Sequence, residues 1–120
     1  MSGKRTDLKI RKLNGELSVC GQLHAEDVAA VSARGFRALM CLRPDGEGED
    51  QTPYADIGAA ATIVGLQSVY IPVVPGQMGA EQIAAYDAAM AHLPGPVLAY
   101  CRSGARAEAL ADASTAAKRR

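Results

Sequence analysis

Aromatic residues are scarce in this chain of 120 residues, which has no tryptophan, one phenylalanine and four tyrosines. Alanine supplies 23 residues, so much of the 48% apolar content consists of single methyl groups. We therefore expect a core of Leu, Ile, Val and Met, with thin Ala-rich helices lying close to a sheet. The length fits one domain within the usual range of about 100–200 residues, so residues 1–120 are predicted to form a single domain.

The chain also lacks a net charge, because 13 basic and 13 acidic residues cancel. This balance leaves no electrostatic footprint for nucleic acid or for an anionic membrane. No stretch approaches the roughly 18–20 apolar residues that a membrane helix needs. The first twenty residues have no apolar segment typical of a signal peptide. We predict a cytoplasmic protein with no nucleic-acid partner and no membrane partner; the oligomeric state does not follow from the sequence.

Cysteines are few and odd in number: Cys20, Cys41 and Cys101. Their spacing matches no zinc pattern, and a disulfide scaffold does not fit a chain this long and this apolar. No metal site and no cofactor are therefore predicted. Cys20 and Cys41 are interpreted as small buried apolar side chains, which leaves Cys101 for chemistry.

Segments with strand-like and helix-like patterns alternate along the chain. A hairpin is expected at the start, around Asn14-Gly15, with a type I′ turn at that pair. Thr52 is predicted to be an N-cap followed by proline at the first helical position. Further strands are expected at 37–42, 68–74 and 96–100, and helices at 25–34, 53–64, 80–93 and 106–117. This order predicts an α/β fold with a mainly parallel sheet covered by helices on both faces.

The segment from Cys101 to Arg106 has the most distinctive pattern. An apolar strand ends at the cysteine, a short loop with one glycine follows, and an arginine opens a helix. The N–H groups of such a loop, with the positive end of the helix, form a site for anions, and the guanidinium of Arg106 can fold over an oxyanion. The same surroundings lower the pKa of a cysteine and make its sulfur nucleophilic. The candidate substrate-binding positions are Arg102, Ser103, Gly104 and Ala105; the alternative is a buried cysteine followed by a helix capped by Ser103.

The segment from Cys101 to Arg106 is one of several segments that together resemble a known family. The matching segments are 18–22, 35–37, 42–47, 70–73 and 93–104, in this order along nearly the whole chain. The sequence resembles a bacterial family of phosphatase or sulfurtransferase domains with the protein-tyrosine-phosphatase fold. Members of that family occur alone or fused ahead of a metallo-β-lactamase-like persulfide dioxygenase. The resemblance implies this fold, with an N-terminal β-hairpin.

Three departures from related phosphatases point to weak or absent phosphatase activity, and the first two of them favour sulfur chemistry. Four residues separate Cys101 from Arg106, where phosphatases of this fold generally have five, and the shorter loop resembles that of rhodaneses. The segment 75–77 lacks the carboxylate that dual-specificity phosphatases place there to protonate the leaving group. Ala107 stands where related enzymes usually have Ser or Thr. Transfer of sulfur between thiols needs less proton donation than phosphate ester cleavage, because thiolates leave easily.

Asp45 keeps the phosphatase alternative open. It follows a predicted parallel strand, and the carboxyl ends of such strands gather around one crevice, so Arg43 and Asp45 could face Cys101. The other interpretation of Asp45 is a turn residue, since Pro-Asp-Gly is itself a turn sequence.

The sequence therefore predicts a sulfurtransferase that carries a persulfide on Cys101, with Arg106 binding the anionic donor or acceptor. One alternative is a phosphatase with Cys101 as phosphoryl acceptor, Arg106 as clamp and Asp45 as acid. The other is a non-catalytic module that binds an anion or a partner. The expected partner is a small anionic sulfur or phosphate substrate, with a persulfide dioxygenase as a candidate second partner.

Overall fold

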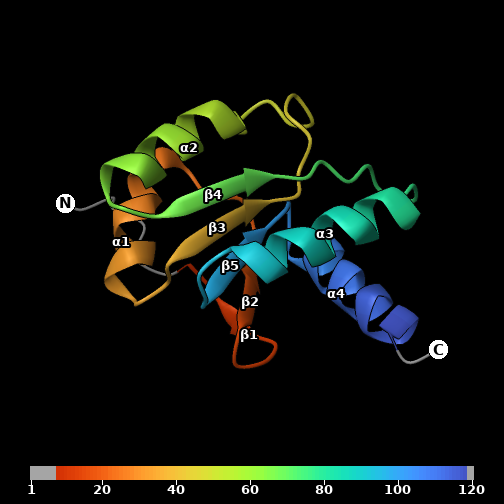
Figure 1. Ribbon diagram of the computed structural model, residues 1–120. Coiled ribbons are helices and arrows are strands. Elements are labelled where there is room, and N and C mark those ends of the chain that lie inside the picture. Colours follow the sequence, from red (N-terminus) through yellow and green to blue (C-terminus); the bar gives the residue numbers. More distant parts are fainter. Residues whose placement is uncertain (1–7, 119–120) are drawn as a thin grey trace.

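A central sheet with helices on both faces organises the chain (Figure 1). The computed structural model describes residues 8–118. Its strands are β1 (Arg11–Lys12), β2 (Leu17–Cys20), β3 (Ala38–Cys41), β4 (Gln67–Tyr70) and β5 (Val97–Tyr100). Its helices are the 3-10 turn η1 (Ala25–Asp27), α1 (Val28–Ala33), α2 (Tyr54–Ile63), α3 (Ala80–His92) and α4 (Ala105–Lys118). The predicted order of elements is confirmed.

The strands lie in the order β1-β2-β5-β3-β4. Four of them are parallel, and only β1 runs antiparallel, against β2. In β5, the residue Tyr100 pairs with Cys20 on one side and with Cys41 on the other. Since β5 is central and has neighbours on both sides, the segment that follows it is held on a rigid base.

Side chains that alternate along the strands divide the core into two halves. Leu98 and Tyr100 of β5 pack on one face with Val28, Val31 and Ile57 from α1 and α2. The other face packs against α3 and α4 through Tyr86, Ala107 and Leu110. The largest buried side chains are mostly Leu, Ile, Val and Met, as predicted from the composition.

The N-terminal hairpin forms, but its predicted turn is wrong. Neither Asn14 nor Gly15 has the positive φ that a type I′ turn requires. Instead the Asn14 side chain accepts hydrogen bonds from the N–H groups of Glu16 and Leu17, at 2.8 and 3.0 Å. A side chain that bonds nearby amides offers the backbone another way to turn. The strand β1 begins only at Arg11, two residues after Lys9, whose φ of 51° is outside the extended range.

The predicted cap of α2 is a second correction. Thr52 does not cap this helix: its hydroxyl lies 2.7 Å from Nδ1 of His24. The N–H of Tyr54, the first residue of α2, donates to Oδ1 of Asp45 at 2.8 Å. The cap therefore comes from a loop nine residues earlier in the chain, which joins that loop to α2.

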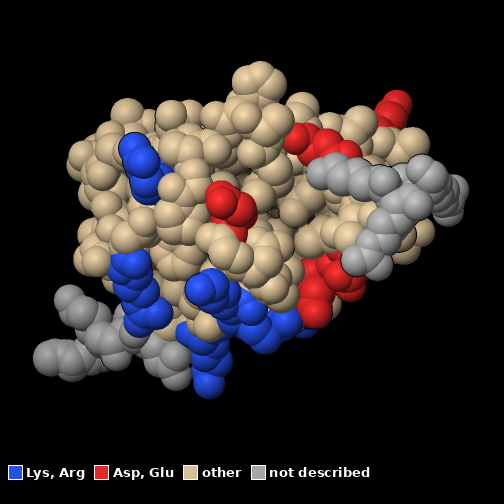
Figure 2. Space-filling model, turned by 60° about the horizontal axis from the view of Figure 1, so that its bottom comes forward, with Lys and Arg blue, Asp and Glu red and all other residues tan. Residues whose placement is uncertain are grey.

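Charged side chains of both signs lie on the face that Figure 2 shows, with basic groups along its lower edge and acidic groups at several other places. No single sign covers this face. None of the helices within residues 8–118 is long and apolar enough to cross a membrane. Over the same residues, no three His, Cys, Asp or Glu side chains gather closely enough to hold a metal ion.

Candidate active site

Cys101 lies directly after β5, at the base of the loop that leads into α4. Its side chain is buried, and its Sγ accepts a hydrogen bond from the N–H of Gly104 at 3.0 Å. Gly104 has φ of 95°, a conformation that glycine adopts without strain, and this turn aims its N–H back at the sulfur. A donated N–H is the kind of contact that stabilises negative charge on an acceptor atom.

The loop packs directly on the backbone of the neighbouring strand. The N–H of Cys101 donates to the carbonyl of Cys20 at 3.4 Å. A Cβ placed on Gly21 would lie 2.9 Å from the carbonyl oxygen of Arg102, a distance that real side chains do not tolerate. Gly21 is therefore needed for this close approach of β2 to the loop.

The positive end of α4 faces the same loop. The hydroxyl of Ser103 accepts a hydrogen bond from the N–H of Ala105, the first residue of α4, at 3.3 Å, while Gly104 takes the cap position itself, since its carbonyl accepts from the N–H of Glu108. The side chains of Arg102, Ser103 and Ala105 are exposed, whereas Gly104 is buried. What these residues present to an anion is chiefly their backbone, together with the N–H groups in the first turn of α4.

Arg106 reaches from the first turn of α4 to two other loops. Its Nη1 donates to Oε2 of Glu47 at 2.9 Å and to the carbonyl of Val73 at 3.0 Å, and its Nη2 donates to Oε1 of Glu47 at 2.7 Å. Among the described residues, no hydrogen bond uses Nε. The edge formed by Nε and Nη2 thus remains for an oxyanion, which an arginine binds at two points.

Arg43 supports the same carboxylate from the loop after β3. Its Nε donates to Oε1 of Glu47 at 2.9 Å, and its Nη1 donates to Oε1 of Gln22 at 3.0 Å. The hydrogen bond from Arg106, followed by that from Arg43, holds the pKa of Glu47 below its ordinary value, while Glu47 raises the pKa of Arg106. Two guanidinium groups share one carboxylate, so the cluster carries an excess positive charge.

Asp45 lies in this loop but is turned toward α2. Besides the bond from Tyr54 to its Oδ1, its own N–H donates to the hydroxyl of Tyr70 at 2.9 Å. No hydrogen bond within residues 8–118 joins Asp45 to Cys101 or to Arg106. The structure thus gives Asp45 the turn and capping contacts, and it brings Arg43, but not the Asp45 carboxylate, into contact with the Arg106 cluster.

The other two cysteines lie behind the site. Burial, with the nearby Cys101 and Asp27, raises the pKa of Cys20 to about 12. Burial also raises the pKa of Cys41, whose thiol donates to the carbonyl of Arg43. Both side chains pack on the sheet face opposite to that of Cys101, as small apolar groups in the core.

Comparison with known proteins assigns the chain to a family. Residues 9–118 match the phosphatase-like domain of beta-lactamase hydrolase-like proteins. The chain belongs to this phosphatase-like family. A beta-lactamase hydrolase-like protein of Xylella fastidiosa (strain Temecula1) is 35% identical over 100 residues. That match covers 83% of this chain but 23% of the relative, so the similarity spans under a quarter of the relative's length.

Solved structures share the fold of this chain. A candidate phosphatase from Neisseria meningitidis superposes with a TM-score of 0.78 at 29% identity, over 84% of this chain and 72% of that one. Tk-PTP in its active form superposes with a TM-score of 0.59 at 17% identity, over 79% and 63% of the two chains. The predicted protein-tyrosine-phosphatase-like fold is thereby confirmed.

Three polar side chains of the site were not singled out from the sequence: Gln22, Glu47 and Gln51. Gln51 accepts hydrogen bonds from the N–H groups of Glu47 and Gly48, both at 3.1 Å, and donates to the carbonyl of Pro44 at 2.8 Å. It fixes the loop that presents Glu47. Gln22 and Glu47 both lie inside the segments on which the family resemblance was recognised, and that position was the available signal.

Proposed function

We propose that this phosphatase-like domain is a phosphatase that forms a phosphoryl intermediate on Cys101. Two features of one loop carry the proposal. The N–H of Gly104 donates to Cys101 Sγ, and the edge of Arg106 formed by Nε and Nη2 is left for an oxyanion. The family assignment and the likeness to a candidate phosphatase support the same class. The function favoured by the sequence alone, sulfur transfer, thus becomes the second candidate.

In the proposed reaction, Cys101 Sγ attacks the phosphorus of a bound phosphomonoester. The P–S bond forms as the bond to the leaving oxygen breaks, and that oxygen takes a proton from an acid or from water. Loop N–H groups and Arg106 bind the equatorial oxygens, where charge is concentrated in the transition state. Water then attacks phosphorus, the P–S bond breaks, and phosphate leaves with the thiolate restored.

The general acid, which would protonate the leaving group, is the role that the described side chains of this site fill least well. Glu47 is unsuited, because its two arginine partners favour the ionised carboxylate. Asp45 is the remaining candidate, although one of its oxygens accepts the N–H of Tyr54. A phosphatase with this arrangement should favour esters whose leaving groups need little protonation.

The second candidate, persulfide transfer, rests on a specific feature: no carboxylate within residues 8–118 hydrogen-bonds toward Cys101. In that reaction the Cys101 thiolate attacks the outer sulfur of a donor persulfide. The S–S bond of the donor breaks, its thiolate leaves, and the persulfide now on Cys101 is passed to an acceptor thiol.

Mass spectrometry of the acid-quenched protein distinguishes the two. The protein is incubated with nitrophenyl phosphate in one sample and with thiosulfate in another, with Cys101→Ser as the control for each. We expect a phosphoryl group on the peptide that contains Cys101, with release of nitrophenol. A gain of one sulfur atom from thiosulfate, with neither a phosphoryl adduct nor nitrophenol, would overturn the phosphatase proposal in favour of sulfur transfer.

A further inference from the structure

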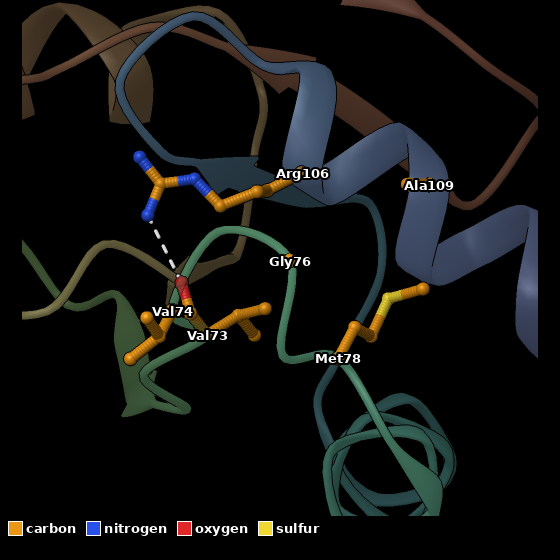
Figure 3. A pocket seen from close by; sticks show the side chains of 6 residues that line it. All are labelled: Val73, Val74, Gly76, Met78, Arg106 and Ala109. Carbon is orange, nitrogen blue, oxygen red and sulfur yellow. Dashed lines mark hydrogen bonds between the residues drawn. The ribbon is translucent and has the colours of Figure 1, made fainter.

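A hollow lies between α4 and the segment that follows β4. Its volume is about 310 Å³. Figure 3 shows its lining residues: Val73, Val74, Gly76, Met78, Arg106 and Ala109. The reaction as described above assigns no role to this space.

The lining is apolar apart from one residue. Val73, Val74, Met78 and Ala109 line it, and Arg106 is the single charged residue of the lining. Val74 is 45% exposed, one of two large hydrophobic side chains that the described part of the chain leaves open to solvent. An apolar wall with an exposed valine at its edge fits an apolar group that covers it on binding.

Arg106 belongs both to the lining of the hollow and to the candidate anion site, which is the loop from Cys101 to Arg106. In Figure 3 the Arg106 side chain extends from α4, and its guanidinium lies at one end of the group of residues, bonded to the carbonyl of Val73. Ala109 and Met78 lie toward the other end. Arg106 and Ala109 are three positions apart on α4, so they are neighbours on one face of the helix. A molecule with its anionic head on Arg106 would extend its other end toward Ala109.

The size and chemistry of the hollow limit this other end. A volume of about 310 Å³ is at the small end of ligand pockets, which run from roughly 300 to 1,000 Å³. A single ring or a short alkyl chain fits that space. With no second charged side chain in the lining, a further carboxylate, ammonium or phosphate on the substrate would lose its hydration without a partner.

We propose that this hollow, the Ala109 pocket, binds the organic part of the substrate, and that the substrates are phosphomonoesters whose organic part is small, apolar and uncharged. This inference rests on the proposed phosphatase function and specifies its substrate class. Phenyl phosphate and hexyl phosphate represent the class. Phosphoserine and glycerol phosphate, with polar organic parts, lie outside it.

Calorimetry of ligand binding to Cys101→Ser tests the proposal, because this variant keeps the loop from position 101 to Arg106 and does not hydrolyse the ligands. We expect phenyl phosphate to bind about tenfold more tightly than inorganic phosphate, as burial of most of a ring would give. Phosphoserine and glycerol phosphate should gain no such factor. In the wild-type protein, kcat/KM should follow the same order.

Two substitutions assign the gain to the pocket. Ala109→Leu, made in the Cys101→Ser protein, should fill the space and remove most of the preference for phenyl phosphate while leaving the affinity for inorganic phosphate within about twofold. Ala116→Leu, at an exposed position farther along α4, is the matched control and should change neither affinity. Met78→Ala should enlarge the pocket and shift the preference from phenyl toward naphthyl phosphate.

The outcomes separate this inference from the function beneath it. If inorganic phosphate does not bind at all, the phosphatase proposal fails, and the pocket proposal falls with it. If inorganic phosphate binds but phenyl phosphate binds no better, or if Ala109→Leu leaves the preference intact, only the pocket proposal is overturned. Tight binding of phosphoserine would likewise overturn it, because that ligand carries two further charges.

Discussion

Glu47 and Arg106, which are 59 positions apart in sequence, form a two-point ion pair with N–O distances of 2.7 and 2.9 Å. The carboxylate occupies the edge formed by Nη1 and Nη2 of the guanidinium and so fixes the plane of Arg106. Arg43 holds the same carboxylate from behind, at 2.9 Å. Such a pre-set fork loses less entropy on binding an oxyanion than a free arginine would.

Glu47→Gln should therefore weaken anion binding although the substitution removes a negative charge near the anion. The amide offers one acceptor in place of two and cannot hold Arg106 at two points, so we expect a loss of about tenfold in phosphate affinity. Isothermal calorimetry measures it, and Glu49→Gln, in the same loop, is the control. Tighter phosphate binding by Glu47→Gln would show that Glu47 competes with the anion and does not position Arg106.

The same pair gives a pH dependence of stability. Because the folded protein holds the pKa of Glu47 below its ordinary value of 4.5, this group stabilises the fold fully above that value. The contribution is lost as the pH falls from 4.5 through the lowered pKa. In urea unfolding, the difference between wild type and Glu47→Gln should be constant near neutral pH and shrink below 4.5. A difference that persists unchanged in acid would contradict this.

The order of strands and helices could be predicted from the sequence because apolar runs and breaker residues alternate with a clear period. The loop from Cys101 to Arg106 was predictable for a related reason: its parts are local, and a strand, a glycine and a helix start lie within a few residues. Gly104 then takes the positive φ that this geometry demands.

The partners of Arg106 could not be predicted in this way. The loop after β3 has four acidic residues, Asp45, Glu47, Glu49 and Asp50, and no local pattern says which one faces α4. That choice depends on Gln51 and Tyr54, which fix the loop by hydrogen bonds, and on packing between strands far apart in sequence. The turn type at Asn14 was predicted wrongly because a local side-chain hydrogen bond replaced the expected backbone conformation.

Cys101 should be the first of the three cysteines to react with iodoacetamide near pH 6. Cys20, with a pKa of about 12, and Cys41, with a raised pKa, stay protonated at that pH, and the thiolate is the reactive form. Peptide mapping by mass spectrometry after brief labelling gives the order. The control is Cys101→Ser, which should label slowly at both remaining sites; faster labelling of Cys20 or Cys41 in the wild type would contradict the assignment of Cys101 as nucleophile.

Arg106→Lys keeps the positive charge but loses the planar fork. A lysine cannot bind Glu47 at two points and an oxyanion at two more, so affinity for phosphate or thiosulfate should fall at least about tenfold. Circular dichroism and urea unfolding should show that the fold is intact. Arg102→Lys is the matched control, because the Arg102 side chain is exposed. An unchanged dissociation constant for Arg106→Lys would remove this residue from the site.

Gly21→Ala tests how closely the end of β2 approaches the loop from Cys101 to Arg106. The added Cβ would lie 2.9 Å from the carbonyl oxygen of Arg102, so the loop must move, at a cost of about 1–3 kcal/mol in stability and with weaker anion binding. Gly15→Ala is the control, since a Cβ there meets nothing within 4 Å. Urea unfolding and phosphate calorimetry of both variants decide it; equal behaviour of the two would mean that the loop tolerates the shift.

Asp45 has two separable roles, and two substitutions divide them. Asparagine keeps an oxygen that can accept the N–H of Tyr54 but cannot supply a proton, whereas alanine loses both properties. If Asp45 is the acid of the proposed phosphatase, Asp45→Asn should slow cleavage of hexyl phosphate by about 10²-fold or more and leave nitrophenyl phosphate little changed, because nitrophenolate departs without a proton. Asp45→Ala should add a loss of about 1 kcal/mol in stability from the missing cap. Steady-state rates on both esters, with urea unfolding of each variant, provide the measurement.

Equal rates for wild type and Asp45→Asn on the alkyl ester would exclude Asp45 as acid and confine it to its cap on α2. Thiosulfate–thiol exchange offers a contrast within the same set of proteins: its leaving group is already a stable anion, so Asp45→Asn should not slow it under either outcome.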